Sequence, residues 1–236
     1  MKDEHTGRPG SPTRRSGISP ITVRRLSLYL RYLEELAEKG QSTVASRQLG
    51  QALGLTAAQV RKDLAYFGQF GRPGVGYHVG KLANHLRSIF GTDRISNVAV
   101  VGVGDLGRAL LRYRGWLKKG FRVVGAFDTA PSTIGKKFGK VAVQSMDQLP
   151  AAVKTHQIRL AILAVPAGVA QEVAGQICRA GVQGILNFAP VTLNVPAAVA
   201  VVPVDLAVQL EQLSYLTNTR APRRRPGNRA KRRPQP

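Results

Sequence analysis

The segment VAVVGVGDLG, from Val98 to Gly107, constrains the fold of this chain more than any other stretch of its sequence. Its apolar first half predicts a buried strand, and glycines follow at positions 102, 104 and 107. Glycines at this spacing let the backbone turn sharply out of a strand, admit a close ligand and pack the next helix tightly. The segment therefore predicts a strand, a glycine-rich turn and a helix that begins near Leu106.

The sequence that follows alternates between apolar runs and helical patterns. Such alternation predicts a parallel, doubly wound sheet, because each helix carries the chain back to begin the next strand in the same direction. The result would be a Rossmann-type α/β domain. The expected strands lie at 98–103, 121–127, 158–165, 184–188 and 199–204, and the expected helices at about 105–118, 147–154, 167–180 and 205–216.

The glycine turn predicts a dinucleotide site. A pyrophosphate would approach the backbone at Gly104 and bind the amides at the positive end of the following helix. A second strand ends at Asp128, where a carboxylate binds ribose hydroxyls and repels a 2′-phosphate, so NAD(H) is expected rather than NADP(H). The candidate nucleotide-binding residues of the loop and this strand are Gly102, Val103, Gly104, Asp105, Leu106, Gly107 and Asp128.

No residues suited to catalysis accompany this site. A hydride-transfer enzyme needs a general acid or base beside its substrate, but the histidines at 5, 78, 85 and 156 fall elsewhere. The single cysteine, Cys178, excludes an internal disulfide and a cysteine-rich zinc site, and no metal is expected. The nucleotide is thus expected to be a ligand that the protein senses, with no catalytic residues and no enzyme activity.

The first half of the chain predicts a helix-turn-helix. In STVASRQLGQALGLTAAQVRKDLAYFG, Ser46 is expected to cap a short helix that ends near Leu53, and Gly54 makes the turn. Thr56 then caps a second helix over Ala57–Phe67. Two short helices joined by a glycine turn are typical of a DNA-binding unit, here spanning about residues 27–66.

The second of these helices has the composition of a recognition helix. Its apolar stripe faces the core, which leaves polar and basic side chains for the major groove. The next segment, GRPGVGYHV, predicts a β-hairpin wing with an arginine that could enter an A·T-rich minor groove. The candidate DNA contacts are Ser46, Gln59, Arg61, Lys62, Tyr66 and Arg72.

The net charge of +22 supports a polyanionic partner. Residues 220–236 contain eight Arg or Lys residues and no acid, and we interpret this tail as an aid to solubility or to nonspecific binding of nucleic acid, with no specific role. Basic residues also outnumber acidic ones in the parts expected to fold. No stretch is apolar enough to span a membrane and no secretory signal precedes the first helix, so a cytoplasmic protein is expected.

These patterns divide the chain into two folded parts between two tails. We expect basic, disordered tails at 1–17 and 218–236, because both lack apolar periodicity and are rich in Pro, Gly and Arg. Between them lie a winged helix-turn-helix at 18–92, a Rossmann domain at 93–204 and a C-terminal helix at 205–217.

The combined motifs resemble the Rex family of redox-sensing transcriptional repressors, over about residues 18–216. The motifs that carry the resemblance are QVRKDLAYFG, GRPGVGY, VAVVGVGDLGRAL, GAFD, LAVPA and GILNFAP, in that order. The resemblance implies a homodimer that binds operator DNA, binds NADH more tightly than NAD⁺ and releases the operator when NADH is bound. It also implies that the C-terminal helix is swapped between subunits.

The resemblance further implies a redox switch of three residues. Tyr113, in the helix after the glycine loop, would lie by the nicotinamide. Asp205, which opens the last helix, would exchange between Tyr113 and Arg31 of the first helix as the redox state changes. The chain departs from some members at Leu206, where they carry an aromatic residue, and in its long basic tail.

Two other classes of protein remain open from the residues alone. One is an NAD-dependent oxidoreductase with an accessory DNA-binding domain, which the absence of catalytic residues opposes. The other is a CoA-binding protein, because AILAVPA and GILNFAP also resemble segments of CoA-ligase domains. The carboxylate of Asp128 opposes this second alternative.

Overall fold

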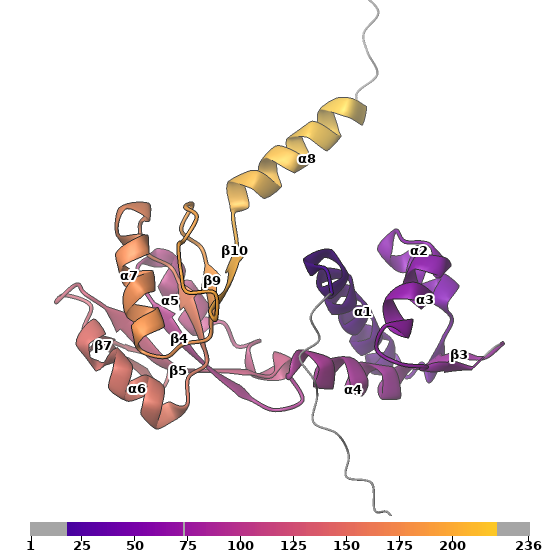
Figure 1. Cartoon of the computed structure of the whole chain (residues 1–236), viewed down its shortest axis with the longest axis horizontal. Coiled ribbons are helices and arrows are strands. Elements are labelled where there is room, and N and C mark those ends of the chain that lie inside the picture. The colour runs from indigo at the N-terminus through magenta and orange to yellow at the C-terminus, as the bar shows by residue number, and fades with distance from the viewer. Residues whose placement is uncertain (1–17, 73, 221–236) are drawn as a thin grey trace, which may run out of the picture. The chain divides into compact units, whose positions relative to one another are not determined.

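The computed structural model describes residues 18–72 and 74–220. The tail predicted at 1–17 lies outside these residues, and so does the tail predicted at 218–236 from residue 221 onward. The chain divides into two compact units, with the division between Arg94 and Ile95 (Figure 1). None of the helices in the described ranges is long and apolar enough to cross a membrane.

The first unit contains four helices and a small antiparallel sheet. The sheet has the strand order β1-β3-β2, and β2 and β3 form the expected hairpin wing. Its elements are α1 (Pro20–Glu38), β1 (Thr43–Val44), α2 (Ser46–Leu53), α3 (Ala57–Ala65), β2 (Gly71–Arg72), β3 (Gly76–His78) and α4 (Val79–Phe90).

Local signals fix the ends of these helices. Thr56 caps α3 as predicted, since its side chain accepts a hydrogen bond from the amide of Gln59. Gly54 ends α2 in the left-handed conformation that glycine adopts without strain. The predicted cap at Ser46 is wrong, because Ala45 occupies the N-cap position and makes no side-chain hydrogen bond, and Ser46 is the first residue of α2.

The core of the first unit forms where α1 packs on α4 and on the helix-turn-helix. Leu26, Tyr29 and Leu33 recur at helical spacing on α1 and are fully buried. On α3, the predicted stripe of Val60 and Leu64 is buried against them. The position of α3 is therefore set by its apolar face, which leaves its opposite face to solvent.

The second unit is a seven-stranded sheet with the order β10-β9-β8-β4-β5-β7-β6, and only the edge strand β6 is antiparallel. The order reverses next to β4, as in a Rossmann fold, so the predicted fold class is confirmed. The elements are β4 (Ser96–Val101), α5 (Asp105–Arg112), β5 (Phe121–Asp128), β6 (Lys137–Phe138), β7 (Val141–Ser145), α6 (Leu149–His156), β8 (Leu160–Leu163), α7 (Ala167–Arg179), β9 (Gly184–Asn187), β10 (Ala200–Pro203) and α8 (Leu206–Arg220).

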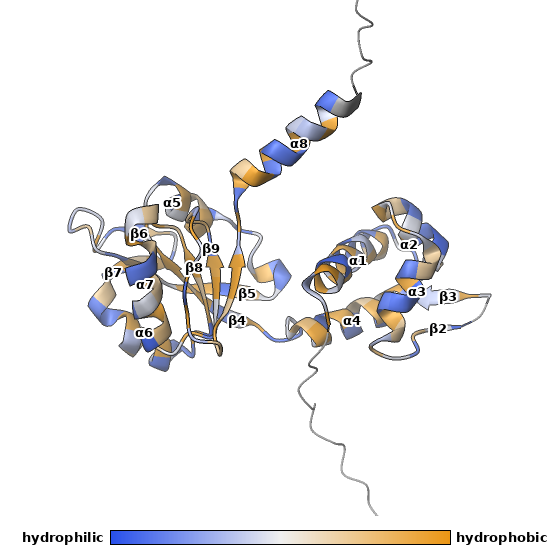
Figure 2. Ribbon diagram, turned by 45° about the horizontal axis from the view of Figure 1, so that its top comes forward, coloured by the Kyte–Doolittle hydropathy of each residue, from blue (hydrophilic) through white to orange (hydrophobic). Residues whose placement is uncertain are grey.

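The two faces of this sheet are covered unequally. Helices α6 and α7 pack on one face around Val101, Phe127 and Leu163, all buried (Figure 2). Helix α5 packs on the other face, over β4 and β5. No helix occurs in the segment 188–199 between β9 and β10, so that second face is left bare over β8, β9 and β10.

The main differences from the predicted elements are two missed strands and two helix ends. Strands β6 and β7 were not expected, and α8 extends to Arg220, into the segment assigned to the tail. Helix α5 ends at Arg112 instead of continuing to about 118, and a short 3₁₀ turn, Leu117–Lys119, follows it. The indole Nε1 of Trp116 donates to the Leu110 carbonyl at 2.9 Å and so satisfies one of the carbonyls that the last turn of α5 leaves without a helical partner.

Candidate functional site

The glycine loop joins β4 to α5 at the carboxyl edge of the large sheet. Gly102 has φ +90°, and a side chain there would collide with the carbonyl of Ala164. A side chain at Gly107 would collide with the carbonyl of Gly102, so this glycine allows the helix to approach the strand. A methyl group at Gly104 would meet no protein atom within 4 Å. The free space at Gly104 is where a ligand can approach the backbone.

Asp128 ends the neighbouring strand β5 and faces the same loop. Its Oδ2 accepts a hydrogen bond from the amide of Val103 at 2.6 Å, and its Oδ1 accepts one from Ala130 at 2.8 Å. Each carboxylate oxygen keeps a second lone pair for a ligand. Asp128 therefore holds the glycine loop and is oriented by it.

A cleft of about 380 Å³ opens over this loop. The amides at the start of α5 have no partner inside the helix, and they form the positive end of its dipole. Phosphates, a ribose and an apolar ring system are the groups that such a lining fits. Its walls include Gly102, Val103, Gly104, Arg108, Asp128 and Val165.

Arg108 is a residue of the cleft that the sequence analysis did not single out. It forms an ion pair with Asp105, whose carboxylate is 98% exposed at the first position of α5. The carboxylate of Asp105 would repel a pyrophosphate bound beside it, and the positive charge of Arg108, one turn later, offsets this repulsion. The sequence did carry a signal for this ion pair, because Asp105 and Arg108 are three residues apart on one predicted helix.

Tyr113 lies at the carboxyl end of α5. The predicted position within the helix is wrong, because α5 ends at Arg112 and Tyr113 is its C-cap residue. Tyr113 is 55% exposed, and its ring lies edge-on to Trp116 at 5.1 Å between centroids. Tyr113 is not among the residues that line the cleft.

The other two switch candidates lie in different units. Asp205 is half-buried and its Oδ1 accepts hydrogen bonds from the amides of Ala207 and Val208, at the start of α8. It lines a separate hollow of about 340 Å³ with the buried Asn187. Arg31 is exposed on α1.

The exposed face of α3 carries most of the predicted DNA contacts. Arg61, Lys62 and Tyr66 are exposed, and so is Arg72 in the wing. The Nη1 of Arg61 donates to the Oγ of Ser46 at 3.0 Å, which joins two candidates from neighbouring helices. Side chains that project from a second short helix after a tight turn can enter the major groove.

Gln59 is tied into a buried network that the sequence analysis missed. Its Nε2 donates to Asp63, a carboxylate only 4% exposed. Arg25 donates to both oxygens of Asp63, at 2.6 and 2.7 Å, and the hydroxyl of Tyr29 donates at 2.8 Å. Burial acts to raise the pKa of Asp63, but the hydrogen bonds from these three side chains outweigh it and lower that pKa.

Family profiles match both units. Residues 17–65 match a profile described as a putative DNA-binding protein N-terminus, and residues 93–191 match one described as a CoA binding domain. The described residues contain no group of three or more His, Cys, Asp or Glu side chains placed to bind a metal ion.

Curated relatives match nearly the whole folded chain. A redox-sensing transcriptional repressor Rex from Carboxydothermus hydrogenoformans is 50% identical over 84% of this chain and 95% of its own length. Another, from Pelotomaculum thermopropionicum, is 45% identical over 84% of this chain and 93% of its own. Both matches extend across the two units.

Solved structures agree with these relatives. The crystal structure of RSP in complex with β-NAD⁺ and operator DNA is 38% identical, has a TM-score of 0.82, and is matched over 87% of this chain and 94% of its own. The structure of RSP with β-NADH is 36% identical, with a TM-score of 0.79 and coverage of 87% and 96%.

A helix-turn-helix unit followed by a dinucleotide-binding fold defines a ligand-responsive transcriptional regulator. The chain belongs to the Rex family of redox-sensing transcriptional repressors. The resemblance inferred from the motifs is thereby confirmed. Since the relatives are named as repressors, the expectation of a regulator without enzyme activity is also confirmed.

Proposed function

We propose that this protein represses transcription by binding operator DNA as a homodimer and leaves the operator when NADH fills the cleft over its glycine loop. The observation that carries the proposal is the cleft, in which the free backbone at Gly104 and the carboxylate of Asp128 face one loop. The solved relative with operator DNA and β-NAD⁺ supports the same pairing of ligands. We place the protein in the cytoplasm, where NADH and DNA are both available.

The DNA contact is assigned to α3 and the wing. Arg61 and Lys62 are exposed on α3, and Arg72 is exposed on the wing. We assign base-edge contacts to Arg61 and Gln59, and phosphate contacts to Lys62 and Tyr66. Ser46 orients Arg61 through the hydrogen bond between them.

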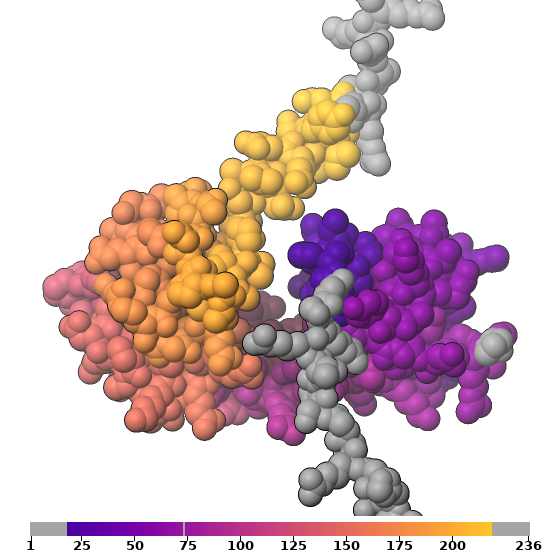
Figure 3. Space-filling view, viewed as in Figure 1, coloured from indigo at the N-terminus to yellow at the C-terminus, as the bar shows by residue number. Residues whose placement is uncertain are grey.

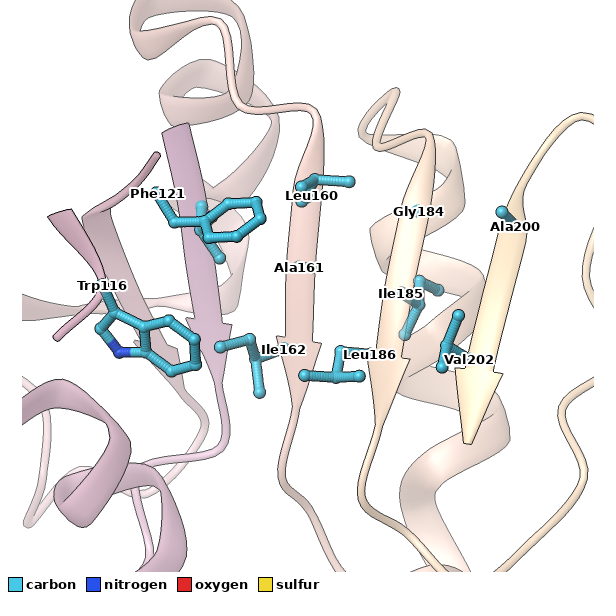
Figure 4. Close-up of a pocket in the computed structure, with 11 residues that line it drawn as sticks. Trp116, Phe121, Leu160, Ala161, Ile162, Gly184, Ile185, Leu186, Ala200 and Val202 are labelled. Atoms are coloured by element: carbon cyan, nitrogen blue, oxygen red, sulfur yellow. The ribbon is translucent and has the colours of Figure 1, made fainter. Parts of the chain in front are cut away.

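The homodimer is supported by apolar surface that the second unit leaves uncovered. The bare sheet face forms a hollow of about 300 Å³, lined by Trp116, Ile162, Leu186 and Val202 among others (Figure 4). Helix α8, drawn in yellow in Figure 3, also exposes large apolar side chains, among them Leu206, Leu210 and Leu213. Apolar surface of this kind is typical of an interface. A second copy of the chain, including its α8, is the proposed cover.

In this proposal, Asp205 senses the redox state of the bound nucleotide. Its partner is Tyr113 when NADH is bound and Arg31 when DNA is bound. Its hydrogen bonds to the start of α8 support a plain capping role as the alternative, in which Asp205→Ala costs about 1 kcal/mol and leaves the redox response unchanged. A switch role predicts that Asp205→Ala and Arg31→Ala each narrow the difference between the effects of NADH and NAD⁺ on operator binding. The double variant should then narrow that difference no further than either single variant does.

The decisive experiment is a titration of labelled operator duplex with the full chain, in the presence of NADH, NAD⁺, NADPH or CoA. Release by NADH alone at low concentration is the expected result, because a ligand shifts an equilibrium only through its different affinities for the two states. Unchanged operator affinity at saturating NADH would refute the proposal. Release by CoA would instead favour the CoA-binding alternative.

A further inference from the structure

We propose that the edge at which the parallel strands of the large sheet begin is a second contact surface for duplex DNA, one that binds phosphates without reading sequence. This inference rests on the proposed function in one respect, since it takes DNA as the partner. The strands begin together, because Ser96 pairs with Phe121, and Leu160 with Gly184 (Figure 4). We call this edge the basic edge.

Cationic side chains gather along the basic edge. All of them are exposed, and each lies just before a strand, at its first residues or at the end of a helix that leads into one. They are Lys118, Lys119, Arg122, Lys154, Arg159 and Arg179.

The acidic residues of the same unit lie elsewhere. Asp105, Asp128, Asp147 and Asp205 all follow or end strands at the opposite edge of the sheet. Glu172 and Glu211 lie within α7 and α8, away from the strand starts. The unit is therefore polarised, with its excess positive charge on one side.

The register brings two of these arginines close together. Arg122 pairs with Asn97 on β4, and Leu160, which follows Arg159, pairs with Val98 on the other side. At about 4.8 Å between strands, the Cα atoms of the two arginines are about 10 Å apart. Asn97 lies between them and donates to the carbonyl of His156 at 2.6 Å, which brings the end of α6 to the same place.

Helix dipoles explain only part of this charge. Lys154 and Arg179 lie in the last turns of α6 and α7, where cations stabilise a helix end. Arg122 and Arg159 lie at strand starts, where a helix dipole does not account for a cation. The only partner of the Arg159 side chain in the described residues is the uncharged amide of Gln183. Like charges that gather without acids repel one another and favour a polyanion.

A short covalent connection joins the two units. Helix α4 ends at Phe90 and β4 begins at Ser96, so five residues lie between them. A fully extended chain of this length spans about 20 Å. The first residue of β4 is therefore tethered within about that distance of the end of α4. Contacts at the basic edge would neutralise DNA phosphates, in addition to the base contacts that the proposed function assigns to α3.

The test compares two double variants of the full chain. In Arg122→Gln/Arg159→Gln, two charges of the basic edge are removed. In Lys136→Gln/Lys137→Gln, the same charge is removed from exposed positions at the start of β6, the one antiparallel strand of the described sheet. Binding to operator and to random duplex is measured as a function of KCl concentration, and NADH affinity by calorimetry confirms that both variants fold.

The edge variant should lose at least about tenfold in affinity at 0.1 M salt for both duplexes, with a shallower salt dependence, because each phosphate contact contributes about 0.9 to the slope. The control variant should stay within about twofold of the unaltered protein. Equal behaviour of the two variants would overturn the proposal. A loss of affinity confined to the operator would also overturn it. So would binding of a poly-glutamate peptide at the basic edge, if the edge variant kept the salt dependence of DNA binding unchanged.

These outcomes are separable from a failure of the proposed function. NADH should still release operator from the edge variant, since its cleft is unaltered. If the unaltered protein showed no preference for operator and no response to NADH, the repressor proposal would fail. The comparison of variants on random duplex would still decide the role of the basic edge.

Discussion

Arg25 of α1 and Asp63 of α3 are joined by two parallel hydrogen bonds, from Nε at 2.6 Å and from Nη2 at 2.7 Å. They are 38 residues apart in the sequence, and the pair fixes the recognition helix to the first helix of the chain. The planar guanidinium suits a carboxylate in a way that a lysine does not. Because Asp63 is buried, this pair sets the orientation of α3 as well as its stability.

Arg25→Ala should lower the free energy of unfolding by about 1–3 kcal/mol, since it leaves a buried carboxylate without its cation. Arg24→Ala is the matched control, because its neighbour Arg24 is exposed and should change stability by less than about 0.5 kcal/mol. Urea denaturation of both variants measures the difference. Equal effects would mean that the pair contributes no more than a surface charge.

The stability contributed by Asp63 should depend on pH in one direction. Its pKa is lowered in the folded protein, so its contribution is present above the unfolded-state pKa of about 3.9 and is lost as the pH falls through the folded-state pKa. The difference in unfolding free energy between the unaltered protein and Asp63→Asn should stay constant from pH 7 to about pH 5 and shrink below about pH 4. A difference that shrinks already above pH 5 would contradict the lowered pKa.

Gly104→Ala should eliminate NADH binding and leave the fold intact. The new methyl group meets no protein atom within 4 Å, so it should cost little stability, yet it occupies the space that a pyrophosphate needs. The variant should bind operator with and without NADH alike. Calorimetry with NADH and thermal unfolding are the two measurements, and retained NADH binding would place the nucleotide elsewhere.

Arg61→Ala should weaken binding to the operator by about 5- to 150-fold, which corresponds to about 1–3 kcal/mol for a lost base-edge contact. Binding to random duplex should change much less, and NADH affinity should be unaltered. Lys39→Ala, at the end of α1, removes the same charge away from α3 and serves as the control. If operator and random DNA lost affinity equally, Arg61 would be a phosphate contact.

Sequence patterns predicted most of the second unit because its signals are local. The strand, the glycine turn and Asp128 follow from residue types at fixed spacing, and Gly102 and Gly107 stand where close backbone approach requires them. Strand β7 was missed because Val141–Val143 is a short apolar run without a clear alternation. It becomes a strand by pairing with β5 and β6.

Features that depend on distant partners could not be read in this way. Asp63 follows Arg61 and Lys62, and its pattern is that of a solvated helix face. Its burial depends on Arg25 and Tyr29, which the fold brings to it from α1. The end of α5 was missed as well, and there the indole of Trp116, six residues after Leu110, donates to the Leu110 carbonyl in the last turn.

The segment 188–199 connects β9 to β10 without a helix, and this has a thermodynamic consequence. The second copy proposed to cover this sheet face would act as a ligand of the folded state. By mass action, the melting temperature of the second unit should then rise with protein concentration. Dilution should lower that temperature toward the value of a unit whose sheet face is uncovered.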